Sequence, residues 1–262
     1  MSKLAIKLLA YTIIFFFISH NVTGQSNENT PIKLTKQSEQ FLRNIKAGKS
    51  TSEFRSQLAK TSIETLEKSL VTDSEKLAFW VNIYNGYIQI VLAENPDLYN
   101  DRGSFFKKRQ IPIAGNTVSF EKIEHGIIRK SQWPLGLGYV RKWFPNRLER
   151  KLRVENRDYR IHFALNCGAK DCPPVAIYEA DKLDVQFNKG TAKYLIDTSI
   201  YEKDNQKVII TPLFSWFRGD FGGKKEVKLI LKEFEIIPTT ENIEIDYKNY
   251  DWTLDLDNWT DL

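Results

Sequence analysis

The residues that could carry out nucleophilic or metal chemistry are few in this chain. It has 262 residues but only two cysteines, Cys167 and Cys172, and three histidines. His20 falls in an apolar N-terminal segment, so His125 and His162 remain as partners for the cysteines. A thiolate acts as a nucleophile or a metal ligand, and histidine is its usual base or co-ligand. We therefore expect function to centre on the turn that contains both cysteines.

One interpretation makes Cys167 a nucleophile. A thiol at the end of a predicted strand and followed by a glycine is exposed to substrate, and a nearby histidine can ionise it. His125 or His162 would be the base, and backbone amides of residues 168–170 would stabilise an oxyanion. An amide or a carboxylate would orient the base, and the candidates are Asn82, Asn85 and Glu124.

Three other interpretations of the turn stay open. Cys167 and Cys172 can form a disulfide, although closing so short a loop supplies only about 2 kcal/mol. Zinc can bind His125, His162 and one or both cysteines, which are suitable ligand types but lack the short paired spacings of zinc motifs. Finally, both cysteines can be ordinary packed thiols, which are common in protein cores.

A predicted helix over residues 75–94 carries further polar candidates. Asp73 and Ser74 supply capping side chains, and Pro96 ends the helix. The helix is apolar on most of its circumference, so it should be buried at the centre of the fold. Its polar stripe consists of Asn82, Asn85 and Gln89. Unpaired buried amides each cost about 1–3 kcal/mol, so these side chains either bond to loop backbone or form the wall of a polar site.

A second predicted helix, over residues 120–130, presents a charged stripe with a histidine at its centre. Ser119 caps it, and its core face consists of Phe120, Ile123 and Ile127. Glu121, His125 and Arg129 recur every four residues on another face. Arg129 could hold a carboxylate or phosphate, and pairing with Glu121 is the structural alternative.

The remaining pattern predicts an α+β fold. Two or three short helices precede residue 73, a long irregular loop spans residues 131–158, and an aromatic segment, 213–221, packs on the domain. The predicted strands and later helices are a hairpin over 110–119, a strand over 159–166, a helix over 181–196, a hairpin over 199–211 and a helix over 225–235. We expect a single domain over 36–262, with N-terminal helices, a central buried helix and a small, mainly antiparallel sheet.

The N-terminus predicts export. Residues 1–24 combine Lys3 and Lys7, an apolar run and a small-residue ending, which is typical of a secretory signal peptide. The run is shorter than the roughly 20 residues that span a membrane, so we expect cleavage and no stable membrane insertion. Residues 25–35 would be a disordered spacer, and the protein would be periplasmic or secreted. An oxidising compartment favours the disulfide.

The charge pattern gives no indication of nucleic-acid binding. The formal charge is +5, and loss of Lys3 and Lys7 with the leader would reduce it to +3. The basic clusters at 107–109 and 147–153 lack the glycine and aromatic context of nucleic-acid motifs. We expect no nucleic-acid partner and no cofactor.

Three multi-residue motifs resemble those of one known family. They are Phe79 to Asn85, Ile123 to Arg129 and His162 to Pro174, with Trp216 to Phe221 similar to a closing element. In this order they resemble the domain of unknown function 547, over roughly residues 70–222. The resemblance implies no reaction, but it implies that the residues in its motifs share a pocket: Trp80, Asn82, Asn85, Glu124, His125, Arg129, His162, Cys167 and Cys172.

The leading hypothesis from the sequence is an exported thiol-dependent hydrolase or acyltransferase acting on peptide or amide bonds. Its catalytic residues would be Cys167, His125, His162 and Glu124, and its substrate-binding residues Trp80, Asn82, Asn85 and Arg129. The alternative is a non-catalytic envelope binding module, in which a Cys167–Cys172 disulfide staples a polar pocket for a small peptide, glycopeptide or carboxylate ligand. A zinc-dependent hydrolase is the third possibility.

Overall fold

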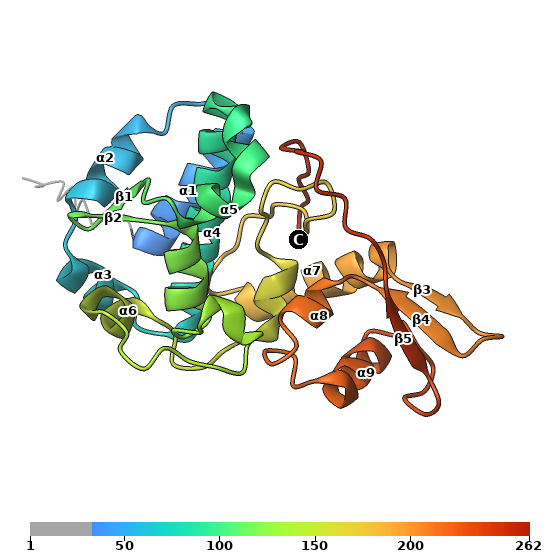
Figure 1. Cartoon of the computed structure of the whole chain (residues 1–262). Helices are drawn as coiled ribbons and strands as arrows, with labels where there is room; N and C mark the ends of the chain where they lie inside the picture. Colours follow the sequence, from blue (N-terminus) through green and yellow to red (C-terminus); the bar gives the residue numbers. More distant parts are fainter. Residues whose placement is uncertain (1–32) are drawn as a thin grey trace, which may run out of the picture. The chain divides into compact units, whose positions relative to one another are not determined.

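The computed structural model describes residues 33–262, so the predicted leader lies outside the described residues, as does the spacer up to residue 32. The first helix begins at Leu34, within the last residues of the predicted spacer. The N-terminal region contains short helices, as predicted, followed by the long helix α4 (Figure 1). Their bounds are α1 Leu34–Lys46, α2 Ser52–Lys60, α3 Ile63–Ser69 and α4 Asp73–Glu94.

Helix α4 is the central buried helix, as the sequence predicted. Fifteen of its residues are buried, and it packs along α1. Its N-terminal cap differs from the prediction, because Thr72 and not Asp73 or Ser74 fills that position. The Thr72 hydroxyl accepts a hydrogen bond from the Glu75 amide at 3.2 Å, and the Glu75 carboxylate accepts one from the Thr72 amide at 3.0 Å. These reciprocal bonds form a capping box.

The capping box gives a first test of the fold. We expect Thr72→Ala to lower the free energy of unfolding by about 1 kcal/mol, because an amide of the first turn loses its partner. Urea unfolding measures this change. Ser74→Ala is the control, since Ser74 is exposed in the same turn. An equal decrease in the free energy of unfolding of both variants would contradict the assignment of the cap to Thr72.

A short connection and a hairpin follow α4, and the hairpin was predicted. Helices η1 (Pro96–Asp101) and α5 (Arg102–Lys107) lead into strands β1 (Ile111–Ile113) and β2 (Asn116–Val118). The strands are antiparallel, with Ile111 opposite Val118. The inward-facing residues of both strands enter the core around α4.

The predicted helix after the hairpin is present, but most of it is a π-helix, η2 (Lys122–Ile128). The Ser119 hydroxyl accepts a hydrogen bond from the Lys122 amide at 3.1 Å, as expected of a cap. At the other end, the Arg129 amide bonds to the Glu124 carbonyl at 2.8 Å. This wider turn changes the side-chain spacing that an α-helix would give. Such turns are frequent at functional sites.

The predicted strand over 159–166 is wrong. Residues Tyr159–Phe163 form a 3-10 helix, η4. The Asp158 carboxylate accepts hydrogen bonds from the Arg160 amide at 2.9 Å and from its guanidinium, which caps this turn. Alternating apolar residues matched a strand, but the described chain offers no neighbouring strand for pairing. The preceding loop, predicted to be irregular, contains two short helical turns, η3 (Pro134–Gly136) and α6 (Arg147–Leu152).

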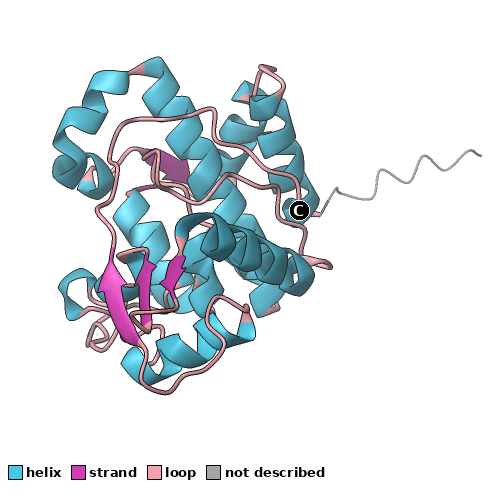
Figure 2. Ribbon diagram, turned by 90° about the vertical axis from the view of Figure 1, so that its right-hand side faces the viewer, coloured by secondary structure: helices cyan, strands magenta, loops and turns pink. Residues whose placement is uncertain are grey.

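The C-terminal part forms a second apolar cluster around a three-stranded sheet (Figure 2). The predicted helix α7 (Leu183–Thr198) and hairpin of β3 (Ile200–Glu202) and β4 (Lys207–Ile210) are present. Strand β5 (Glu244–Tyr247) was not predicted, and it pairs parallel to β4. Helices α8 (Leu213–Trp216) and α9 (Lys224–Glu233) complete the cluster, so the fold is α+β with two small sheets.

Residues 250–262, the last of the chain, form a strap over the cysteine turn. The Lys170 amide donates to the Thr253 carbonyl and the Asp255 amide donates to the Gly168 carbonyl, at 2.8 and 2.9 Å. A further bond joins the Val175 amide to Asn258 at 2.8 Å. The strap therefore fixes the turn from one side. Across residues 33–262, no helix combines the length and apolarity that a bilayer span requires.

Candidate functional site

A cavity of about 230 Å³ brings together the segments that carry the sequence motifs. Its wall is largely aromatic, with one acidic and histidine-containing side. All four predicted catalytic residues, Cys167, His125, His162 and Glu124, line it. The other lining residues are Tyr84, Phe106, Glu121, Leu165, Cys172, Pro173, Leu213, Trp216, Phe217, Tyr250 and Trp252.

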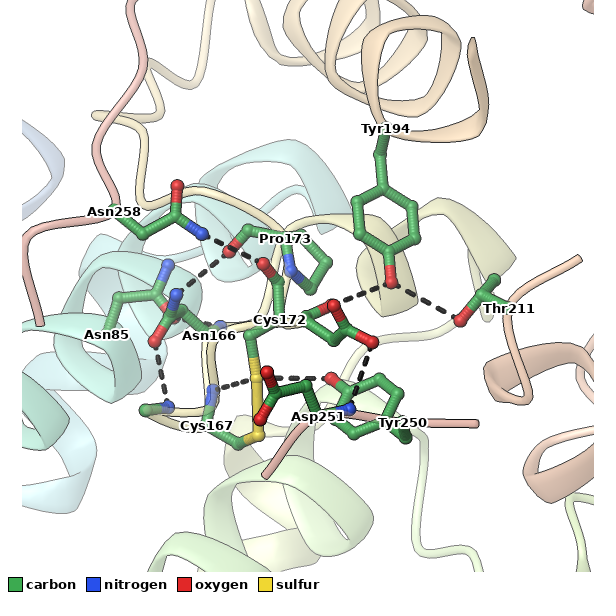
Figure 3. Close-up of a disulfide and its surroundings, with 12 residues drawn as sticks. Asn85, Asn166, Cys167, Cys172, Pro173, Tyr194, Thr211, Tyr250, Asp251 and Asn258 are labelled. Atoms are coloured by element: carbon green, nitrogen blue, oxygen red, sulfur yellow. Dashed lines mark hydrogen bonds between the residues drawn. A yellow bond between two sulfur atoms is a disulfide. The ribbon is translucent and has the colours of Figure 1, made fainter. Parts of the chain in front are cut away.

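The two cysteines are joined in a disulfide at the cavity wall (Figure 3). Their Cα atoms are 6.2 Å apart, within the usual range for such a bond. Neither cysteine is free. Of the four interpretations of the turn, the structure therefore shows the disulfide, and a nucleophilic Cys167 would first require reduction.

Two of the three backbone amides expected to form an oxyanion site already donate hydrogen bonds within the protein. The Gly168 amide donates to the Asn166 side-chain oxygen at 2.8 Å. The Lys170 amide donates to the Thr253 carbonyl in the C-terminal strap. Since an oxyanion site needs unoccupied donors, the amides of residues 168 and 170 do not provide one in this arrangement.

His162 is held by a carboxylate that the sequence analysis did not select as a site residue. Its Nε2 lies 2.8 Å from Asp220 Oδ2, and its ring stacks on Phe217 with centroids 4.0 Å apart. Burial lowers the pKa of His162, although the Asp220 carboxylate raises it. We therefore take the imidazole as neutral, with Nε2–H donating to Asp220.

Asp220 also joins two arginines to the histidine. Arg129 Nε donates to Asp220 Oδ2 at 2.6 Å, and Arg157 Nη1 donates to Oδ1 at 2.6 Å. The pKa of Asp220 falls to about 2, because bonds to His162 and Arg129 outweigh the effect of burial, which raises it. Asp220 lies in the Trp216 to Phe221 segment, so the resemblance offered a signal for it.

A glycine contact fixes the position of Asp220. The Gly219 amide donates to the Leu137 carbonyl at 2.8 Å. A Cβ on Gly219 would lie 2.5 Å from the Gly138 carbonyl carbon, which no side chain could accept. The close approach of these two loops therefore requires glycine at position 219.

His125 and Glu124 form the acidic side of the cavity together with Glu121. Burial and the nearby Arg129 guanidinium lower the pKa of His125 to about 3, so the ring is neutral and its Nδ1 accepts a hydrogen bond from Arg129 Nη1. Burial raises the pKa of Glu124, while the charge of Arg129 opposes that shift. Its Oε1 lies 3.8 Å from His125 Nδ1.

The four predicted substrate-binding residues do not line the cavity. Arg129 is 1% exposed and lies behind the wall, where its guanidinium carbon is 4.6 Å from the Phe217 ring centroid. Trp80 is also buried and packs edge-on against Phe79 at 5.1 Å. Arg129 therefore holds His125 and Asp220, and Trp80 belongs to the core.

Asn82 and Asn85 are amide clamps for loop backbone, the structural alternative weighed for this stripe. Asn82 donates to the Tyr178 carbonyl at 2.8 Å and accepts from the Tyr178 amide at 3.0 Å. Asn85 bonds in the same way to the Ala164 carbonyl and the Asn166 amide, both at 2.9 Å. Both side chains are fully buried. They position the two ends of the segment that contains the cysteines.

The zinc interpretation finds no support in the arrangement of side chains. Within residues 33–262, no three or more His, Cys, Asp or Glu side chains are grouped so that they could hold a metal ion. Both cysteine sulfurs are joined to each other, which leaves no thiolate for zinc.

The fold and the cavity together define an α+β domain whose pocket is lined by a disulfide, aromatic rings and two glutamates, with the Asp220 charge cluster behind its wall. Residues 68–195 match the model of the family described as Protein of unknown function, DUF547, and the chain belongs to this family. The match includes the cysteine turn and both site histidines. No curated protein and no solved structure matches the chain.

Proposed function

We propose that this protein is an exported binding protein whose cavity takes a small organic amine. The observation that carries the proposal is the wall itself, in which, among the described residues, aromatic rings face two carboxyl groups and no lysine or arginine. At about 230 Å³ the cavity is smaller than most pockets for drug-sized ligands. It therefore suits a ligand with one apolar group and one polar head.

The aromatic side would contact the apolar body and the cation. Trp216 and Trp252 stack with ring centroids 5.5 Å apart, and Tyr250 lies 4.7 Å from Trp252. A cation over such rings gains about 0.5–2 kcal/mol from the ring quadrupoles. Phe217 is already covered by Arg129 on one side, at 4.6 Å. The tryptophans and Tyr250 are therefore the better cation platform.

The electrostatic character of the polar side favours a positive head group. Glu121 and Glu124 line the cavity, whereas Arg129 and Arg157 are paired with Asp220 behind it. Both site histidines are neutral, because burial lowers the pKa of each. A carboxylate ligand would face both glutamates, so an amine is the better complement.

The redox state of the cysteines supports binding over thiol catalysis. A disulfide at Cys167 removes the nucleophile that a thiol-dependent hydrolase or acyltransferase requires. Residues 1–24 support export, and an exported protein works where disulfides persist.

Benzylamine and its neutral analogue benzyl alcohol test the proposal by isothermal titration calorimetry. We expect benzylamine to bind and benzyl alcohol to bind at least about tenfold more weakly, because only the amine pairs with the carboxylates. Glu124→Gln should lower benzylamine affinity about tenfold. The matched control is Glu241→Gln, an exposed position away from the cavity lining.

The affinity should also depend on pH in one direction. The pKa of Glu124 is raised, so its carboxylate takes up a proton as the solution is acidified, while the amine stays charged. We therefore expect benzylamine affinity to fall as the pH is lowered toward the raised pKa of Glu124, and Glu124→Gln to flatten this dependence. Equal affinity for the amine and the alcohol would overturn the proposal.

A further inference from the structure

The two sulfurs of the disulfide have different surroundings. Cys172 is 3% exposed, whereas Cys167 is partly exposed. Cys172 Sγ accepts hydrogen bonds from the Cys167 amide at 3.1 Å and from the Tyr250 hydroxyl at 3.3 Å. Figure 3 shows both donors directed at this one sulfur. The disulfide is therefore asymmetric, because Cys167 is the more exposed residue and the sulfur of Cys172 is the hydrogen-bonded one.

We propose that the Cys167–Cys172 disulfide is a thiol-exchange centre that small-molecule thiols reach through the cavity. This activity is separate from amine binding and does not depend on it. An incoming thiolate attacks Cys167 Sγ and forms a mixed disulfide there, while the bond between the two cysteine sulfurs breaks. The electron pair of that bond goes to Cys172 Sγ, which leaves as a thiolate. A second thiolate then attacks the mixed disulfide, and the protein dithiol and an oxidised thiol are the products.

Access selects Cys167 as the attacked sulfur. Exchange requires the attacking sulfur to approach along the disulfide bond axis, and the rate depends on which sulfur can be reached. Cys172 is covered by the C-terminal strap, where the Asn258 side chain donates to its carbonyl at 3.0 Å. Both cysteines line the cavity, but Cys167 is the less buried of the two residues.

The two donors at Cys172 favour it as the leaving group. Hydrogen bonds to a thiolate stabilise the charge, and a more stable leaving thiolate is released faster. Burial raises the pKa of Tyr250, so its hydroxyl keeps the proton that it donates. The neighbouring residue of the strap holds Tyr250 in place, because the Asp251 amide donates a hydrogen bond to the Asp171 carboxylate at 3.0 Å.

The rate of reduction by reduced glutathione tests the role of Tyr250. Samples of the folded protein are quenched with iodoacetamide at intervals, and mass spectrometry counts the alkylated cysteines. We expect Tyr250→Phe to slow reduction about three- to tenfold, because the leaving thiolate loses one donor. Tyr194→Phe is the matched control, since the Tyr194 hydroxyl donates to the Asp171 carbonyl at 2.9 Å in the same turn without contacting sulfur. Its rate should equal that of the unaltered protein.

Single-cysteine variants test which sulfur reacts. With oxidised glutathione, Cys172→Ser should form a mixed disulfide at Cys167 within minutes to hours, while Cys167→Ser should react at least about tenfold more slowly at the buried Cys172. The proposal is overturned if the disulfide is reduced only when the protein unfolds, if Tyr250→Phe and Tyr194→Phe behave alike, or if Cys172 reacts as fast as Cys167. Benzylamine binding by the oxidised protein is measured separately, so each failure is distinguishable.

Discussion

Replacing Asp220 by asparagine should lower the free energy of unfolding by about 3–5 kcal/mol at neutral pH. The Asp220 side chain is 4% exposed and its carboxylate accepts from His162, Arg129 and Arg157. An asparagine side chain would keep the shape but lose the charge, so Arg129, which is 1% exposed, would become a buried cation without a full counter-charge. Removing one partner of a buried pair costs more than the pair contributes, because the remaining charge stays desolvated.

The pH dependence of this effect has a definite sign. The pKa of Asp220 is about 2 in the folded protein, against about 3.9 for an unperturbed aspartate. Its contribution to stability is therefore complete above about pH 4 and is lost as the pH falls toward 2. The difference between the unaltered protein and Asp220→Asn should narrow over that window.

Urea unfolding at a series of pH values measures both predictions. Asp246→Asn is the control, because Asp246 forms an ion pair with Lys207 at the surface, and exposed pairs contribute little. If Asp220→Asn lowers the free energy of unfolding no more than Asp246→Asn does, the central role of Asp220 is contradicted. His162 should also lose its fixed orientation in the Asp220 variant, which NMR of the ring protons would detect.

Asn85→Ala should lower the free energy of unfolding by about 2–5 kcal/mol. The amide of Asn85 bonds to the Ala164 carbonyl and the Asn166 amide, and all three groups are buried. Alanine would leave both backbone groups without partners in a region that water does not reach. Each such group costs about 1–3 kcal/mol, and the cavity left by the side chain adds to the loss.

The same variant should weaken the site as well as the fold. Asn166, the residue that Asn85 holds, donates its side chain to the Pro173 carbonyl at 2.9 Å and so spans the cysteine turn. We expect the loosened turn to reduce benzylamine affinity and to change the rate of disulfide reduction. Asn100→Ala, at an exposed position after α4, is the control for both measurements. Unchanged stability in Asn85→Ala would contradict the clamp.

Much of the α+β fold could be predicted from local patterns. The buried helix α4, the two hairpins and helix α7 follow from apolar periodicity and turn residues, which act between near neighbours in the chain. The strand predicted over 159–166 failed because alternation also fits a 3-10 turn, and only the absence of a pairing strand in the described chain decides between them. Strand β5 was missed because its parallel pairing with β4 depends on a distant segment.

In the candidate site, too, local patterns identified some features and distant contacts decided the others. The sequence brought forward Cys167, His125, His162 and Glu124, because their residue types are scarce or lie in a multi-residue motif, and these four line one cavity. It could not assign the roles of Asn82 and Asn85, since a buried amide stripe serves a loop or a ligand equally well. The bonds to Tyr178 and Ala164 place them with the loop.

The sequence by itself determined most of the helices and both hairpins, which family the motifs resemble and which few side chains are available for chemistry. The tertiary structure decided that Cys167 and Cys172 are joined, that Asp220 connects His162 with Arg129 and Arg157, and that Tyr250 reaches a cysteine sulfur. The physical reason is distance along the chain. Periodicity and caps act within a few turns, whereas these contacts join residues 58 to 91 positions apart, apart from the disulfide itself.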